Sequence, residues 1–116
     1  MNVNFFIHLD FTDAPSWDCV CTLSGYHNRT IFDLDWSLSH NAIATASADD
    51  GVRIFMEKKA GVADPLREPQ FDLTVSQPKA HTQDINCVSW NPIRANLLAS
   101  CSDDGTIKIW DFNHEQ

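Results

Sequence analysis

The chain has 116 residues, 43% of them hydrophobic and 21% charged, which fits one small domain with a modest core. Eight basic against sixteen acidic residues give a formal net charge of −8, so we expect neither nucleic acid nor an anionic membrane as a partner. No apolar run approaches the ~18 residues of a membrane span. No Lys or Arg lies between Met1 and Asp10, so a signal peptide is not predicted and the cysteines are expected to be reduced thiols inside the cell.

The N-terminal segment, residues 1–16, differs from the rest of the chain. Val3 to Leu9 has the β-propensity of an extra strand, and a break from Asp10 to Ser16 that contains Pro15 follows it. A second predicted strand, Cys19 to Leu23, comes next. We expect the body of the chain to span residues 17–116.

The body contains one unit twice. The interval from His27 to Trp36 equals that from His81 to Trp90, an offset of 54 residues between the copies. Further along, the offset is 55 residues, and the matching runs are Ile43 to Phe55 and Leu98 to Trp110. Such self-similarity is typical of repeat architectures. The predicted repeats span about residues 27–57 and 81–112.

Within each repeat the pattern predicts short strands and tight turns. Runs rich in β-formers precede the hairpin signals Asp50-Gly51 and Asp104-Gly105. The predicted strands are Ile31 to Trp36, Phe71 to Val75 and Ile85 to Trp90. The polar stretch 56–70 contains Pro and Gly and predicts an exposed loop. No segment longer than two turns has a helical period, so the predicted fold is all-β.

Four side chains recur at matched positions and can form a buried network. Folding at the two hairpins is expected to bring Trp110 roughly opposite Ser100 and Phe55 roughly opposite Thr45. The turn aspartate can then accept from the preceding histidine, the histidine can bond the hydroxyl, and the indole N–H can donate to that hydroxyl. The predicted set is His81, Ser100, Asp104 and Trp110 in the second repeat, and His27, Thr45, Asp49 and Phe55 in the first.

Ser, His and Asp also make up a hydrolase triad. The set occurs twice, however, a threonine replaces the serine in one copy, and no Gly-x-Ser-x-Gly nucleophile elbow is present. We therefore expect a structural network and no enzymatic activity.

The run from Asp104 to Asp111 resembles the ending of a WD repeat, with His81 in the place of the histidine that opens such a repeat. The first repeat departs from this pattern, because Phe55 replaces the tryptophan. The resemblance implies a β-propeller with four strands per blade, and a closed propeller has at least ~4 blades. We therefore expect a partial propeller of about two blades. The last blade is expected to lack its outer strand, for which Val3 to Leu9 is a candidate.

A more specific resemblance covers Trp17 to Phe112. Trp17 to Ile31, His81 to Pro92 and Leu97 to Gly105 resemble the C-terminal end of the cytosolic iron–sulfur assembly WD-repeat family, the Ciao/Cia family. That family implies a seven-bladed propeller acting as a non-catalytic docking scaffold, which delivers clusters to extramitochondrial apoproteins. The implied partners are subunits of the targeting complex and client apoproteins, in the cytoplasm and also the nucleus. The alternatives are a WD-repeat adaptor of another complex and a non-functional truncated fragment.

The four cysteines suggest a cluster site, since thiolates commonly hold iron–sulfur clusters. Cys19 and Cys21 lie on a different predicted strand from Cys87 and from Cys101, so we expect four buried apolar thiols and no cofactor. His8, His40 and His114 have no partner at ligand spacing, so no metal site is predicted.

Docking is expected on loops and blade rims. The loops that carry the histidines and the turns that carry the aspartates must share one face for the networks to form. The candidate partner-binding residues there are Tyr26, Asn28, Arg29, Asp50, Gln83 and Asp103. Arg94, in the loop from Asn91 to Asn96, belongs to a second surface, together with the loop from Ser37 to Asn41. Open blade edges also predict self-association.

Overall fold

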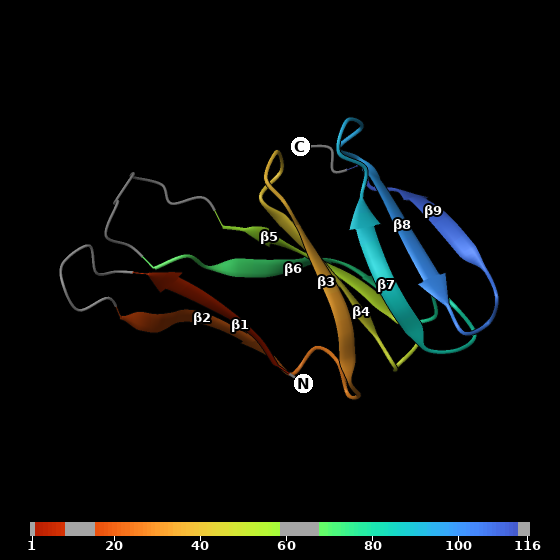
Figure 1. The fold of residues 1–116 in the computed structure, drawn as a ribbon, viewed down its shortest axis with the longest axis horizontal. Helices are drawn as coiled ribbons and strands as arrows, with labels where there is room; N and C mark the ends of the chain where they lie inside the picture. Colours follow the sequence, from red (N-terminus) through yellow and green to blue (C-terminus); the bar gives the residue numbers. More distant parts are fainter. Residues whose placement is uncertain (1, 9–15, 59–67, 114–116) are drawn as a thin grey trace.

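The computed structural model describes residues 2–8, 16–58 and 68–113, which form nine strands and no helix (Figure 1). The strands are β1 (Asn2–His8), β2 (Trp17–Ser24), β3 (Ile31–Ser37), β4 (Ala42–Ser47), β5 (Val52–Glu57), β6 (Phe71–Gln77), β7 (Ile85–Trp90), β8 (Leu97–Ser102) and β9 (Ile107–Asp111). Across these described ranges, no helix has the length and apolar character needed to cross a membrane.

The strands form three antiparallel sheets. Blade one is the four-stranded sheet β3-β4-β5-β6, and blade two is the three-stranded sheet β7-β8-β9. β1 pairs only with β2, in a separate two-stranded sheet. The prediction of an all-β partial propeller is confirmed. In the described part of the chain, blade two lacks a fourth strand beside β9.

The main core lies between the two blades, where β3 and β4 pack against β7 (Figure 1). Alternate residues along a strand face the same side of its sheet. In β4 these are alanines, whose small side chains let the blades approach closely. Blade one contributes Ala42, Ala44, Ala46, Val52 and Ile54, and blade two contributes Ile85, Val88, Trp90 and Leu98.

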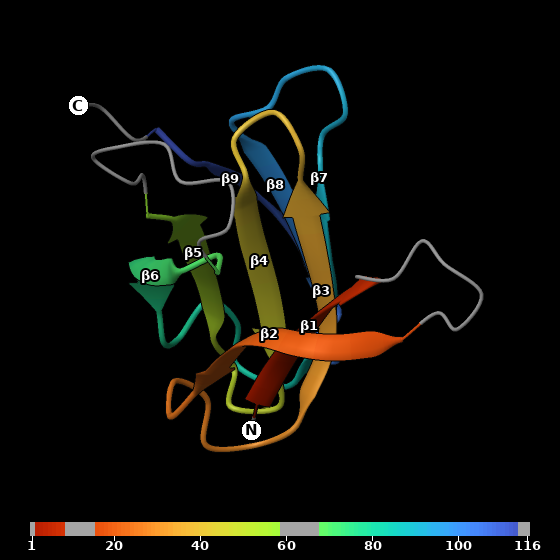
Figure 2. The same cartoon turned by 90° about the vertical axis from the view of Figure 1, so that its left-hand side faces the viewer.

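A smaller core covers the opposite face of blade one. Ile43, Phe55 and Phe71 are buried there with Leu23 of β2. Figure 2 shows the β1–β2 sheet crossing in front of blade one on this side. The N-terminal part of the chain is thus attached to the face of blade one that points away from blade two.

The predicted hairpin register is wrong by two residues. Trp110 pairs with Leu98 rather than with Ser100, and Phe55 pairs with Ile43 rather than with Thr45. Each turn is centred on the aspartate of its network, Asp49 or Asp104, rather than on the residue that follows it. The residue after that aspartate takes the left-handed conformation, with φ of 66° at Asp50 and 83° at Gly105.

The proposed role of the N-terminal strand is also wrong. Val3 to His8 form part of β1, as β-propensity predicts, but β1 pairs with β2 and not with β9. β-propensity identifies a strand without identifying its partner. The loop predicted at 56–70 begins later, because Met56 and Glu57 belong to β5. Residues 59–67 of this loop, residues 10–15 of the N-terminal break and His114 lie outside the described part of the chain.

Candidate docking face and its hydrogen-bond networks

The second repeat holds a complete buried network. His81 donates from Nδ1 to Asp104 Oδ2 at 3.1 Å, and Ser100 Oγ donates to His81 Nε2 at 2.8 Å. Trp110 Nε1 donates to the same Ser100 oxygen at 2.9 Å, across the diagonal of the β8–β9 pair. His81 and Ser100 are each 1% exposed. The Ser100 hydroxyl, which both donates and accepts, thus connects strands β8 and β9 to the loop that carries His81.

The first repeat keeps the histidine, the hydroxyl and the carboxylate. His27 donates from Nδ1 to Asp49 Oδ2 at 2.9 Å, and Thr45 Oγ1 donates to His27 Nε2 at 2.6 Å. Phe55 provides no indole N–H, and its ring packs edge-on against Tyr26 with centroids 4.8 Å apart. A ring contact thus stands where the second repeat has a hydrogen bond.

The two networks also differ beside the aspartate. In the second repeat Thr106 Oγ1 donates to Asp104 Oδ1 at 2.6 Å and lies 3.0 Å from His81 Nδ1. The equivalent residue in the first repeat is Gly51, where a Cβ atom would lie only 2.6 Å from Arg53 Nη1. The Arg53 guanidinium fills this space, with Nη1 2.8 Å from His27 Nδ1 and 3.3 Å from Asp49 Oδ2.

These contacts perturb the titration of the network. Burial lowers the pKa of His27 from its usual value, and the nearby Arg53 charge acts in the same direction, against the opposing effect of Asp49. Burial raises the pKa of Asp49, but its bond and charge interactions with His27 outweigh this, so the pKa is lowered. The hydrogen bond from Thr106 is the main cause of the lowered pKa of Asp104.

The arrangement does not suit nucleophilic catalysis. The Ser100 hydroxyl is enclosed, and it already bonds both His81 and Trp110. A triad serine must reach a substrate carbonyl next to an oxyanion hole. The side chains of His81, Ser100, Asp104 and Trp110 therefore satisfy one another's hydrogen-bonding groups.

The loops around the networks form one face, which we call the loop face. Arg29 is an accessible cation of this face, with 63% of its side chain exposed. Its Nη1 donates to Ala48 O at 3.1 Å and lies 4.0 Å from Asp84 Oδ1 in the loop of the other repeat. Such an exposed ion pair contributes little to stability. Most of the guanidinium surface is therefore available to a partner.

The other predicted residues of the loop face are placed as follows. Tyr26 is half-buried against Phe55, whereas Asn28 and Gln83 are exposed. The Asp50 carboxylate accepts from Lys79 Nζ at 3.4 Å, and the Asp103 carboxylate accepts from Asn86 Nδ2 at 2.7 Å. Asp50 is therefore linked to the loop that follows β6, and Asp103 is linked to strand β7.

An open hollow of about 380 Å³ lies in the loop face, and its lining includes two cations that the sequence reasoning missed. They are Arg53, which reaches in from β5, and Lys79, which follows β6. Arg53 is the repeat equivalent of Lys108. The sequence signal for its different role was Gly51, because the equivalent residue in the second repeat, Thr106, has a side chain that fills the space taken here by Arg53. The hollow is lined by Asn28, Arg29, Ala48, Asp49, Asp50, Arg53, Pro78 and Lys79.

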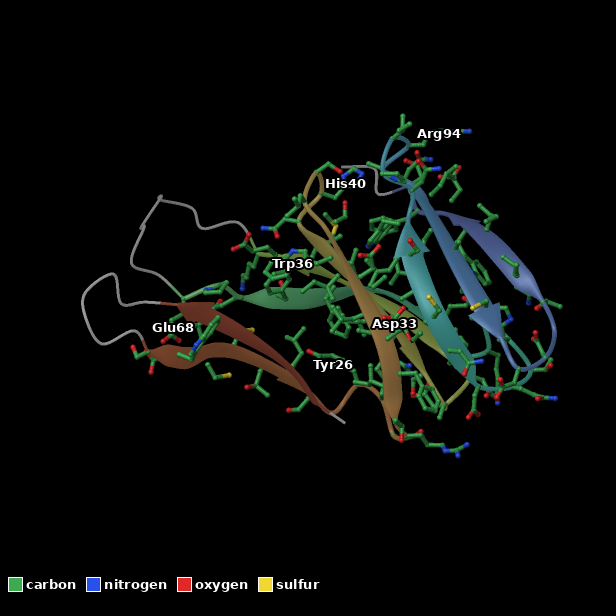
Figure 3. All side chains as sticks on the ribbon, viewed as in Figure 1. Tyr26, Asp33, Trp36, His40, Glu68 and Arg94 are labelled. Atoms are coloured by element: carbon green, nitrogen blue, oxygen red, sulfur yellow. The ribbon has the colours of Figure 1, made fainter. Side chains whose placement is uncertain are left out.

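Arg94 belongs to a different surface. It lies in the β7–β8 loop, at the opposite end of the strands from Tyr26 (Figure 3). The structure therefore brings the other six candidate partner-binding residues to the loop face and leaves Arg94 apart from them.

The cysteines lie on three strands, Cys19 and Cys21 on β2, Cys87 on β7 and Cys101 on β8. The expectation of four buried thiols is wrong, because Cys19 and Cys87 are exposed at the surface of their sheets and Cys21 and Cys101 are half-buried. All four are free, and in the described ranges no group of three or more His, Cys, Asp or Glu side chains is placed to hold a metal ion. A hydrogen bond with Asp33 raises the pKa of Cys87 to about 11, with burial adding to the effect. Burial likewise raises the pKa of Cys21. Both thiols therefore stay protonated at neutral pH.

The chain is similar to proteins named for iron–sulfur assembly. It is 56% identical over 98 residues to the probable cytosolic iron-sulfur protein assembly protein ciao1 of Xenopus tropicalis, which covers 84% of this chain and 28% of that protein. It is 54% identical to the Danio rerio protein of the same name, over 90% of this chain and 31% of that protein. For the Homo sapiens protein CIAO1, the identity is 49% over 88% of this chain and 29% of that protein.

The chain thus spans about 30% of the length of these curated relatives. The family described as WD domain, G-beta repeat, matches at residues 17–55 and 73–111, which is more than half of the chain. These ranges contain both hydrogen-bond networks and both hairpins. The chain belongs to the WD domain, G-beta repeat, family.

Proposed function

We propose that this chain is a non-catalytic docking part of the cytosolic iron–sulfur protein assembly machinery, and that the loop face binds its protein partners. The partners would be other subunits of the assembly complex and the apoproteins that receive clusters. The names of its relatives support this role and a cytoplasmic location. The additional nuclear location that we propose rests on the family resemblance alone.

The observation that carries this proposal is the exposed Arg29 guanidinium, on a loop that the buried His27 network holds in place. In a chain with a net charge of −8, Arg29 and Lys79 lie beside one hollow, with 63% and 78% of their side chains exposed. The buried networks fix the loops that carry these cations. Arginine in a fixed loop is a common anchor at protein interfaces, because its planar guanidinium makes several directional hydrogen bonds.

The charges predict the chemistry of the partner. An acidic protein segment is attracted to Arg29 and Lys79, although the carboxylates of Asp84 and Asp50 partly neutralise these two cations. The other exposed groups of the face, on Asn28 and Gln83, can donate and accept hydrogen bonds. The surface therefore suits a polar partner rather than an apolar helix.

The test is affinity purification of the tagged chain from cytosol, with a full-length relative as the positive control. Recovery of iron–sulfur assembly subunits with both baits supports the proposal. Recovery of those subunits with the control alone contradicts it. Recovery of a different multiprotein complex with this chain would favour an adaptor role elsewhere.

The non-catalytic part has its own test. A fluorophosphonate probe labels activated serines, and we expect no labelling of Ser100, because that hydroxyl is enclosed and bonded on both sides. Stoichiometric labelling at Ser100 would contradict a structural role for the network.

A further inference from the structure

The two blades are copies of one unit, so each face of one blade has an equivalent on the other. The core residues that blade one contributes from β4 and β5 to its contact with blade two are apolar. Their equivalents on the outer side of blade two are apolar as well and are only partly covered. We call this surface the far face of blade two. It comprises Leu97, Ala99, Cys101, Ile107 and Ile109, the equivalents of Ala42, Ala44, Ala46, Val52 and Ile54.

Ile107 and Ile109 on this far face are 74% and 64% exposed, whereas their equivalents Val52 and Ile54 are each 4% exposed. The edge of β9 that points away from β8 has no neighbouring strand in the described part of the chain. An apolar sheet face next to an open strand edge favours association with another sheet.

The complementary surface lies on blade one. Val88 and Trp90 of β7 are buried against blade one, and their equivalents on β3 are Leu34 and Trp36. Leu34 and Trp36 are each 42% exposed. Figure 3 shows Trp36 on the side of β3 away from β7, and Asp33 on the side toward it. We call this exposed side the near face of blade one.

We propose that the near face of blade one binds the far face of blade two of a second copy of this chain. The contact repeats the internal interface between the blades, with Leu34 and Trp36 in the places of Val88 and Trp90. This inference does not depend on the proposed function. Because the two surfaces differ, the contact is heterologous, and successive copies can add head to tail.

The polar part of the internal interface has weaker equivalents in this contact. Inside the chain, Asp33 and Asp35 accept the backbone N–H groups of Val88 and Trp90 at 3.0 and 2.6 Å. The corresponding residues on the far face are Cys87 and Ser89, which are exposed and uncharged. The association between copies therefore lacks two charge-assisted hydrogen bonds and is weaker than the packing within one chain.

The contact also requires a strand exchange. In blade one, β6 pairs with β5. β2 is the repeat equivalent of β6, and β9 is the equivalent of β5. The edge of β2 that the second copy's β9 would join is occupied by β1. Docking therefore replaces β1 by β9 of the second copy, so that β2 becomes the fourth strand of that blade.

A pair of charge variants tests the contact. Leu34→Lys changes only the near face, and Ile109→Lys changes only the far face. Measured by sedimentation velocity, the wild-type chain should show a mass that rises with concentration beyond that of a dimer. Each variant alone should remain a monomer. An equimolar mixture should form a dimer, because each variant retains the surface that the other lacks. This mixture also shows that both variants are folded.

The matched control is Leu38→Lys, at a residue that is 92% exposed in the β3–β4 turn, and it should associate like the wild type. Ser89→Asp restores a carboxylate at the position of Asp35 and should tighten the association about tenfold. A wild-type chain that stays monomeric overturns the proposal. So does a mixture of the two charge variants that stays monomeric, or association that persists in Leu34→Lys.

The strand exchange is tested by fixing β1 on β2. Phe5 and Cys21 are direct partners in the β1–β2 ladder, and Cα atoms of such pairs lie within disulfide range. In Phe5→Cys, oxidation to the disulfide should abolish the association, and a reductant should restore it. Equal association of the oxidised and reduced forms would overturn the exchange of β1.

Discussion

Asp35 on β3 and Trp90 on β7 join the two blades by two hydrogen bonds. The Asp35 carboxylate accepts the backbone N–H of Trp90 at 2.6 Å, and the Asp35 carbonyl accepts its indole N–H at 3.1 Å. The backbone N–H belongs to β7, an edge strand that has a sheet partner on only one side. A side chain from one blade thus satisfies a backbone donor of the next, which fixes the register between blades.

We therefore predict that Asp35→Ala loosens the interface between the blades. The variant leaves the Trp90 N–H without its charged acceptor, and the free energy of unfolding should fall by about 1.5–3 kcal/mol. Asp35→Asn keeps an acceptor oxygen and should lose less. Urea unfolding followed by tryptophan fluorescence measures both. Equal stability of Asp35→Ala and the wild type would mean that the bond is not important.

Gly51 makes room for Arg53, which predicts a clash in Gly51→Thr. The new Cβ would lie 2.6 Å from Arg53 Nη1 and 2.8 Å from Asp49 Oδ1, so the guanidinium must move. We expect a loss of up to about 1 kcal/mol in the free energy of unfolding, because the guanidinium can move into the open hollow but gives up its contacts with His27 and Asp49. The double variant Gly51→Thr with Arg53→Lys reproduces the residues of the second repeat and should recover part of this loss. A single variant as stable as the wild type would contradict the role of Gly51.

Asp50 occupies a conformation that favours glycine, with φ of 66° where Gly105 has 83°. Asp50→Gly should therefore raise the free energy of unfolding by up to about 1 kcal/mol. The lost ion pair with Lys79 offsets little, because the lysine is exposed. Asp50→Ala is the control, since it loses the carboxylate without gaining conformational freedom, and it should not stabilise. Thermal unfolding measures both variants.

The first-repeat network predicts a loss of stability in mild acid. His27 has a lowered pKa in the folded chain, so the unfolded chain binds a proton first as the pH falls below about 6.5. The free energy of unfolding should then fall by at most about 1.4 kcal/mol per pH unit. Asp49, whose pKa is also lowered, adds a further loss below about pH 4.

The check is chemical unfolding between pH 7.5 and pH 5 for the wild type and for His27→Gln. The variant is less stable throughout, but its stability should depend less on pH than that of the wild type. Identical pH slopes for the two proteins would contradict the assignment of this effect to His27.

The sequence predicted the parts of the fold that depend on residue type at repeated positions. The offset of the repeats was enough to place His81, Ser100 and Asp104 together. It did not predict the register of the hairpins, because that depends on which residue adopts the left-handed conformation. The role of Arg53 was also missed, since it requires the space left by Gly51. The partner of β1 could not be inferred from β-propensity, which says nothing about strand pairing.

The central claim is that the loop face binds protein partners, and one comparison tests it most directly. Arg29→Glu reverses a cation on the loop face, and Arg94→Glu makes the same change at the opposite end of the strands. Both variants should match the wild type in thermal unfolding. In quantitative affinity purification from cytosol, Arg29→Glu should lose the iron–sulfur assembly subunits while Arg94→Glu retains them. Retention of the subunits by Arg29→Glu, or their loss in Arg94→Glu alone, would contradict the assignment of docking to this face.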